Sequence, residues 1–218
     1  MTTVPTPPSP SPAPSPALTM AERKRQLVST ELTEAALQLL ARRGFDAVTV
    51  DEIVAEAGVS KRTFFRYFAS KEDVVVQFLA GLGDEMRAAL AARPAAEPPS
   101  AALRAAVAVP LAACTLEHPD HAARALLVVQ LILRTPALLA RLLERQLEWR
   151  ETLAAELAAR DGLDVSAALY PRLAAGTALV AFHTALQRWA ESSAAEDPLA
   201  LLDRAFAVVG PALDAQDR

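Results

Sequence analysis

The sequence has one cysteine, Cys114, seven glycines among 218 residues and an aromatic content of only 5%. A single cysteine excludes a disulfide framework and any zinc site built on several cysteines. Few glycines, few β-branched runs and much alanine favour helices, so an all-β or doubly wound fold is not expected. The longest uncharged run in an apolar stretch, Leu173 to Gln187, has 15 residues, short of the roughly 20 that a membrane span needs.

Charge and the N-terminal residues narrow the class of protein further. The sequence has 22 basic and 26 acidic side chains, a formal net charge of −4, which argues against general coating of nucleic acid. Any contact with DNA must therefore come from a local basic patch. The N-terminus lacks a basic segment followed by an apolar one, so we expect a cytoplasmic protein with no membrane association.

Proline separates a tail from a long helical part of the chain. Residues 1–17 contain seven prolines and no charged side chain, which predicts a disordered tail over residues 1–20, with a proline-rich ligand for another protein as the alternative. Beyond the tail, the helical spacing of apolar residues predicts about nine helices. The clearest loop is residues 93–100, and later breaks fall at Thr135-Pro136, Asp161-Gly162, Tyr170-Pro171 and Asp197-Pro198.

Capping signals mark the first helices. Thr49, with a glutamate three residues later, has the pattern of a capping box, and Gly58 ends the helix that follows. Ser60 and Ser70 are placed to cap the next two helices. The expected helices are residues 21–43, 50–57, 61–68 and 71–92.

The second and third helices are joined by Ala57-Gly58-Val59-Ser60, a turn with the pattern of a helix-turn-helix. From Gly58 to Lys71 the chain has four basic residues and no acidic one, although acidic residues outnumber basic ones elsewhere. In a helix-turn-helix the second helix enters the major groove with its N-terminal residues against base edges. We therefore expect residues 61–68 to bind DNA; the alternative is a solvated basic helix that binds nothing.

Helical spacing separates the roles of the side chains on this helix. Phe64 and Phe68, four residues apart, are expected to face inward. Lys61 and Arg62 lie at the exposed first turn, where arginine can donate two hydrogen bonds to guanine. The residues placed to bind phosphates, which orients the helix without reading sequence, are Thr63, Tyr67 and Lys71.

Residues 49–73, TVDEIVAEAGVSKRTFFRYFASKED, resemble the DNA-binding region of the TetR family of bacterial transcriptional regulators. The resemblance is specific over about residues 27–79. It implies an all-helical homodimer with N-terminal DNA-binding heads, a C-terminal pocket for a small molecule, and a helix over residues 71–92 that transmits motion between them. The expected fold is therefore all-α, with a three-helix helix-turn-helix DNA-binding domain over residues 21–70 and a helical bundle for ligand binding and dimerisation over residues 71–218.

Carried over by position, the resemblance assigns the contacts with DNA. Thr49 matches a phosphate contact of the family, and Lys61 and Arg62 occupy its base-reading positions. Phe65 stands where members often have tyrosine; without a hydroxyl, it is expected to touch a thymine methyl group. Arg66 stands where members have an aromatic residue or histidine, and a phosphate contact is expected. The expected DNA-binding residues are Thr49, Ser60, Lys61, Arg62, Thr63, Phe65, Arg66, Tyr67 and Lys71.

Polar residues within apolar stripes mark candidate ligand contacts in the bundle. Gln146 and Arg150 fall on the same helical face as Leu139, Leu143, Leu153 and Leu157. A buried arginine needs a partner, so Arg150 is expected to meet an internal acid or, alternatively, an anionic ligand. Gln130 lies in an apolar stretch, and a ligand or a neighbouring backbone carbonyl would satisfy it. The expected ligand-binding residues are Gln130, Gln146, Trp149 and Arg150, with an ordinary core position as the alternative for Trp149.

Other residues give weaker signals. Cys114 lacks basic neighbours that would lower its pKa, which disfavours redox sensing. His118, Asp120 and His121 fit a helix start better than a metal site, so neither a metal nor a cofactor is expected. The apolar helix after Pro171 and the stripe that follows it are expected to form a four-helix dimer interface, with the stripe made of Leu199, Leu202, Phe206 and Val209.

We therefore expect a transcriptional repressor that binds a near-palindromic double-stranded operator as a homodimer and is released by a small-molecule effector. An activator or a ligand-independent regulator of the same fold is the alternative. A remote alternative is an enzyme or a scaffold for other proteins. The sequence shows no nucleophile–base–acid set and no glycine loop that would bind phosphate, so an enzyme is not expected.

Overall fold

The structure, a computed structural model, describes residues 19–115, 119–164 and 169–215, without the side chains at 21, 22 and 119–121. These residues are helical and include no strand, so the predicted all-α fold is confirmed. Residues 1–18 of the expected tail and His118 lie outside the described residues. The described helices are α1 (Met20–Arg43), α2 (Val50–Glu56), α3 (Lys61–Tyr67), α4 (Lys71–Ala91), α5 (Pro99–Ala113), α6 (Pro119–Arg134), α7 (Pro136–Asp161), α8 (Leu169–Glu191) and α9 (Pro198–Asp214).

Side-chain hydrogen bonds begin three of the helices at the predicted residues. At the start of α2, the backbone N–H of Glu52 donates to Thr49 Oγ1 at 3.3 Å, and the backbone N–H of Thr49 donates to the Glu52 carboxylate at 2.9 Å. Ser60 and Ser70 cap α3 and α4 by accepting from the backbone N–H three residues later. Gly58 has a φ of +64°, which lets the chain reverse between α2 and α3.

Proline, glycine and a capping aspartate set the boundaries in the bundle. A bend of 94° separates α6 from α7, which begins at Pro136. Gly162, with a φ of +65°, ends α7, and Asp197 caps α9. α8 begins at Leu169, slightly earlier than predicted, because Pro171 fits within the first turn of a helix. Among the described helices none is by itself long and apolar enough to cross a membrane, and α6 and α7 meet the length and composition only as a pair across their bend.

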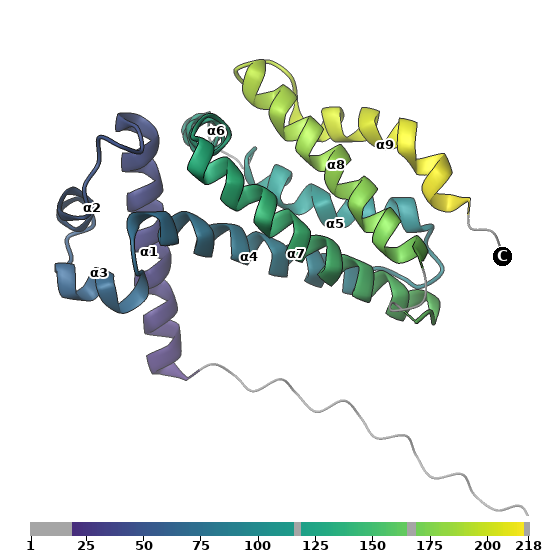
Figure 1. The fold of residues 1–218 in the computed structure, drawn as a ribbon, viewed down its shortest axis with the longest axis horizontal. Coiled ribbons are helices and arrows are strands. Elements are labelled where there is room, and N and C mark those ends of the chain that lie inside the picture. Colours follow the sequence, from purple (N-terminus) through teal and green to yellow (C-terminus); the bar gives the residue numbers. More distant parts are fainter. Residues whose placement is uncertain (1–18, 116–118, 165–168, 216–218) are drawn as a thin grey trace, which may run out of the picture.

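Figure 1 shows α1, α2 and α3 as a head beside a bundle of α5 to α9, with α4 running from the head along the bundle. In the bundle, α4 packs on α5 and α7. α1 packs on α6 as well as on α2 and α4, so two helices connect the head to the bundle. The buried core is continuous from Leu32 and Phe64 in the head to Trp189 and Leu202 in the bundle.

The apolar stripe of α9 packs differently from the prediction, which assigned it to the dimer interface. On α9, Leu202 and Phe206 belong to the core of this subunit, where α9 packs on α5 and α8. The apolar stripe of α9 is therefore used within the subunit rather than offered to a partner. Large apolar side chains are exposed on α7 and α8, among them Leu143, Leu147, Leu173 and Val180, and on α9 Val208 is exposed.

Candidate DNA-binding surface and ligand cavity

Two phenylalanines fix the orientation of α3 in the head. Phe64 and Phe68 are 0% and 1% exposed, and their ring centroids lie 5.4 Å apart. Both belong to the buried core, as their spacing predicts. The opposite side of α3 is therefore directed outward, and its exposed residues are Lys61, Arg62, Phe65 and Arg66.

Lys61 and Arg62 differ in how freely their charges are available. Nζ of Lys61 lies 2.9 Å from a carboxylate oxygen of Asp51 in α2. Both side chains of this pair are more than half exposed, so the pair is weak and can exchange for another anion. The Arg62 guanidinium has no hydrogen bond or ion pair with another described residue. Arg62 can therefore contact a base without giving up a partner.

The remaining polar residues of α3 are arranged in pairs. The hydroxyl oxygens of Ser60 and Thr63 lie 2.9 Å apart, and Ser60 Oγ also accepts from the Thr63 backbone N–H at 3.1 Å. The guanidinium of Arg66 donates to the Tyr67 hydroxyl at 3.2 Å and lies 4.9 Å from the ring centroid. Arg66 and Tyr67 thus present two neighbouring donors, an arrangement suited to one phosphate group.

Lys71 is placed differently from the other predicted phosphate-binding residues. Its Nζ donates to the backbone carbonyls of Phe45 at 2.7 Å and Val48 at 3.1 Å, and lies 4.5 Å from the centroid of the Phe45 ring. The side chain therefore ties the start of α4 to the loop between α1 and α2. Its partners lie more than 20 residues earlier in the chain, so helical spacing could not indicate them.

Thr49 is held in place by the capping box of α2. Its hydroxyl donates to the Glu52 carboxylate at 3.0 Å, and a second oxygen of that carboxylate lies 2.7 Å from Arg43. The backbone hydrogen bond from Thr49, its hydroxyl and the Arg43 guanidinium hold the pKa of Glu52 below its ordinary value. The N-terminal end of α2, where Thr49 would face a phosphate, is thus fixed by local interactions.

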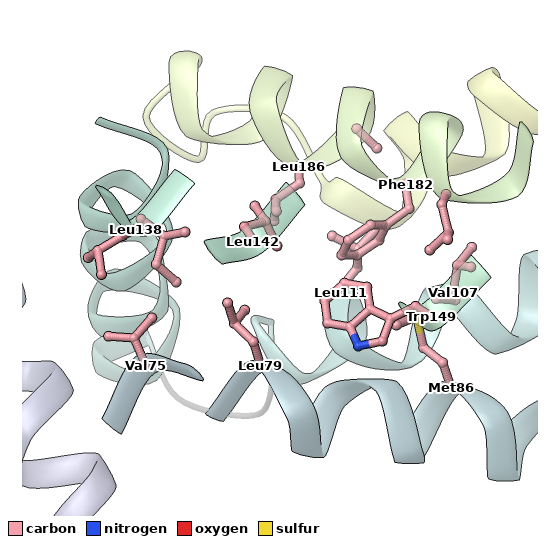
Figure 2. Close-up of a cluster of buried hydrophobic side chains, with 14 of the residues drawn as sticks. Val75, Leu79, Met86, Val107, Leu111, Leu138, Leu142, Trp149, Phe182 and Leu186 are labelled. Atoms are coloured by element: carbon pink, nitrogen blue, oxygen red, sulfur yellow. The ribbon is translucent and has the colours of Figure 1, made fainter. Parts of the chain in front are cut away.

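A cavity of about 630 Å³ lies between α1 and the bundle, with walls from α4, α5, α6, α7 and α8. Its volume falls within the range of about 300–1,000 Å³ that is usual for sites of small molecules. Figure 2 shows part of its apolar wall, where Leu79 of α4 and Leu142 of α7 face Leu186 of α8 and Trp149 lies below Phe182. The ring centroids of Trp149 and Phe182 are 6.5 Å apart.

Of the four predicted ligand contacts, only Trp149 lines this cavity. The Gln130 amide donates to the Ala190 carbonyl at 3.0 Å, which is the backbone alternative considered for it. Gln146 hydrogen-bonds His183 Nδ1 at 2.9 Å, and Arg150 pairs with the neighbouring Glu151 at 3.0 Å. Gln130, Gln146 and Arg150 therefore do not line this cavity.

The positions of Gln146 and Arg150 outside the cavity have a geometric cause. α7 buries Leu138, Leu142 and Trp149, whereas Leu143 is 46% exposed. Over this part of α7 the inward face is thus rotated by one residue from the one predicted, whereas Leu153 and Leu157 of the predicted face are buried. Gln146 and Arg150 lie half-buried on the side of α7 that faces α8. There the aliphatic part of Arg150 lies over Gly176 of α8, where a Cβ would be 3.4 Å from Arg150 Cδ.

Two contributors to the cavity were not assigned from the sequence. One is a polar face of α1. The sequence pattern that could have indicated this face is the helical spacing of Ser29, Thr30 and Thr33. The other is Cys114, whose thiol donates to the Pro110 carbonyl at 3.3 Å. Burial raises the pKa of Cys114 to about 11, so the unreactive thiol form dominates at neutral pH.

A helix-turn-helix head continued by the long helix α4 into a helical bundle is the arrangement of a DNA-binding transcriptional regulator. The family model for bacterial regulatory proteins of the tetR family matches residues 32–78, and the model for the MftR C-terminal domain matches residues 97–214. The chain belongs to the TetR family of transcriptional regulators, which are not enzymes.

Relatives support this membership along most of the chain. The transcriptional regulator TcmR of Streptomyces glaucescens is 36% identical over 70% of this chain and 69% of its own length. A Mycobacterium tuberculosis protein described as the mycofactocin biosynthesis regulator MftR is 32% identical over 88% of this chain and 94% of its own. The structure of FadR from Bacillus subtilis has the same fold, with a TM-score of 0.59 and 20% identity over 85% of this chain and 97% of that one.

Proposed function

We propose that the protein is a repressor that binds a near-palindromic operator as a homodimer and leaves it when an apolar effector fills the cavity. The observation that carries this proposal is that α4, which follows α3 directly, forms a wall of the cavity. An occupant that displaces α4 repositions the head, to the extent that it binds the two conformations with different affinity. Such a repressor acts in the cytoplasm, where its operator DNA is found.

On the operator, α3 lies in the major groove. Arg62 donates to a guanine, Lys61 exchanges Asp51 for a second base or phosphate, and Phe65, 51% exposed, touches a thymine methyl group. Ser60 supports this helix as its cap. The phosphate contacts are Thr49, Thr63, Arg66 and Tyr67. For Lys71 its two carbonyl partners favour a part in holding the head together.

The effector is a hydrophobic molecule of the acyl type. The inner wall of the cavity, formed by residues such as Leu142, Trp149 and Phe182, is apolar and fits a hydrocarbon. The Bacillus subtilis FadR structure is a complex with stearoyl-CoA, which supports an acyl-type effector for a chain of the same fold. Trp149 is the one predicted ligand contact that the proposal retains.

The homodimer forms through the outer face of α7 and α8. Leu143 and Leu147 of α7 are 46% and 56% exposed, and Leu173 and Val180 of α8 are 61% and 66% exposed. On each helix the two residues are four or seven positions apart and share a side. A four-helix interface that takes two helices from each subunit would bury them.

DNase footprinting of the full-length protein on the DNA upstream of its own gene, at a fixed salt concentration, tests the DNA-binding part. We expect a symmetric protected site whose half-sites lie one helical turn, about 34–36 Å, apart. Selection of binding sequences from random DNA extends the test to a remote operator. A folded protein that selects no sequence would contradict the proposal.

Release of the footprint by apolar compounds tests the effector part. Medium-chain and long-chain acyl compounds should abolish protection at concentrations that fill the cavity. A matched series of strongly polar compounds of the same volume should not. Stronger protection in the presence of the acyl compounds would instead favour an activator or a co-repressed regulator.

A further inference from the structure

α1 forms one wall of the cavity although it belongs to the head. The lining residues of α1 recur every three or four positions and therefore share one side of the helix. The other side of α1 packs into the head core through Leu32, Ala36 and Leu40, each 0% exposed. Apart from Leu37, the residues of α1 that line the cavity are polar: Gln26, Ser29, Thr30, Thr33, Glu34 and Gln38.

The polarity of the cavity changes from one side to the other. Leu142, Trp149 and Phe182, from α7 and α8, make the inner wall apolar. The charged lining residues are Glu34 of α1, Glu85 of α4 and Arg124 of α6. Because both acidic and basic groups line the cavity, its polar part favours a neutral hydrogen-bonding group over a strongly charged one.

Two hydroxyl groups of α1 are available for such a group. Ser29 and Thr33 are half-buried, lie one turn apart and both line the cavity. Neither hydroxyl makes a hydrogen bond with another described residue. Each hydroxyl can donate one hydrogen bond and accept others, so a polar atom of an occupant would be a suitable partner.

A second lining residue connects the cavity to α3. The Gln77 side-chain amide donates to the Tyr67 backbone carbonyl at 2.8 Å and to Asp73 at 3.1 Å. Tyr67 is the last residue of α3. An occupant beside Gln77 is therefore one hydrogen bond away from the helix that is proposed to read DNA.

We propose that the effector is amphipathic, with its apolar part between α7 and α8 and a neutral hydrogen-bonding end against Ser29 and Thr33 of α1. The effector then touches the DNA-binding head directly, in addition to acting through α4. The effector binds tightly only when α1 lies against the cavity. The position of the head therefore determines the affinity for the effector. This inference rests on the proposed effector cavity.

The test compares decan-1-ol with 1-chlorodecane, two probes that share a chain and differ in the hydroxyl. Binding is read from protection of Cys114 against N-ethylmaleimide at mildly alkaline pH, because Cys114 lines the cavity and is the only cysteine in the sequence. For the double variant Ser29→Ala/Thr33→Val, we expect the affinity for decan-1-ol to fall about tenfold, the loss of two neutral hydrogen bonds. The affinity for 1-chlorodecane should stay unchanged.

The matched control is Ser192→Ala/Thr152→Val, which removes one serine and one threonine hydroxyl that lie outside the cavity. Those hydroxyls donate to backbone carbonyls of Trp189 and Glu148, at 3.0 Å and 2.9 Å. The control should bind both probes as the unmodified protein does. Equal affinity of decan-1-ol for the α1 variant and the control would overturn the inference while leaving the effector cavity intact. If neither probe protects Cys114 in any of the proteins, the effector cavity itself fails.

Discussion

Gly83 of α4 and Trp149 of α7 fit together so closely that a Cβ on Gly83 would overlap with Cδ1 and Nε1 of the indole. The indole also lines the cavity and lies edge-on to Phe182 of α8. The Trp149 side chain thus contacts α4, the cavity and α8. A ligand that moves Trp149 therefore acts on α4 at Gly83.

The substitution Gly83→Ala tests this fit. The added methyl group should displace Trp149 and lower the free energy of unfolding by about 1–3 kcal/mol. Gly81→Ala is the matched control, because a Cβ at Gly81 meets no atom within 4 Å. Alanine at that position should raise the free energy of unfolding by up to about 1 kcal/mol through helix propensity. Urea denaturation of both variants decides: equal effects would mean that the Trp149 contact carries no constraint.

Arg62 and Tyr67 should differ in how they affect DNA binding. Arg62→Ala is expected to cost about 1–3 kcal/mol and to relax preference at one base pair of each half-site. Tyr67→Phe should weaken binding to all sequences about equally, because it removes a phosphate donor. Affinities for a set of operators with single base changes measure the difference, with Arg141→Ala on α7 as a control. Loss of affinity without a change in base preference for Arg62→Ala would refute its assignment as a base-reading residue.

A substitution of Lys71 distinguishes a structural role in the head from a contact with a DNA phosphate. Lys71→Ala removes charged hydrogen bonds to the Phe45 and Val48 carbonyls and should lower the free energy of unfolding by about 1–3 kcal/mol. The dependence of DNA affinity on salt should keep its slope. If Lys71 instead neutralised a phosphate, the slope of the logarithmic plot would fall by about 1.

The proposed dimer interface predicts a difference between two valines. Val180→Glu on α8 places a charge in the interface and should shift the protein to monomers, with loss of tight binding to a two-half-site operator. Val208→Glu on α9, where the valine is 79% exposed, should leave the dimer unchanged. Sedimentation at several concentrations distinguishes the two. Monomers from the Val208 variant alone would place the interface on α9.

Cys114 predicts a loss of stability at alkaline pH. Its pKa is raised by burial from the ordinary value of 9.0 to about 11, so between these values the unfolded chain loses the proton while the folded protein keeps it. The stability that this thiol contributes is thus complete below pH 9 and is lost as the pH rises toward 11, by up to about 3 kcal/mol. Cys114→Ala should unfold with a flatter pH dependence in this range. The same slope in both proteins would assign the loss to other groups.

The first helices were predictable because their ends depend on local hydrogen bonds. Thr49 and Ser60 each bind a backbone N–H three residues later, and such pairs can be read from the sequence. The inner face of α7 was not predictable in this way. Leu138 and Leu139, and again Leu142 and Leu143, offer two apolar stripes one residue apart, so helical periodicity does not choose between them.

Contacts between distant segments make that choice. On α7, the space beside Gly83 accepts Trp149 and thereby selects the stripe with Leu138 and Leu142. The partners of Lys71 and the polar wall supplied by α1 likewise depend on how helices far apart in the sequence pack. The bounds of α3 and its exposed basic side were thus predictable from spacing and charge, whereas three of the four predicted ligand contacts do not line the cavity.

α1 belongs to the head and also lines the cavity. This limits how the head can be exchanged with that of another regulator. A hybrid that takes its head from another protein and joins it at Ser70 would replace the polar wall of α1 together with the proposed DNA-binding residues of α3. Its ligand specificity would then come from two parents. To transfer DNA specificity alone, the exchanged segment must begin after Arg43, so that α1 stays with the bundle whose cavity it closes.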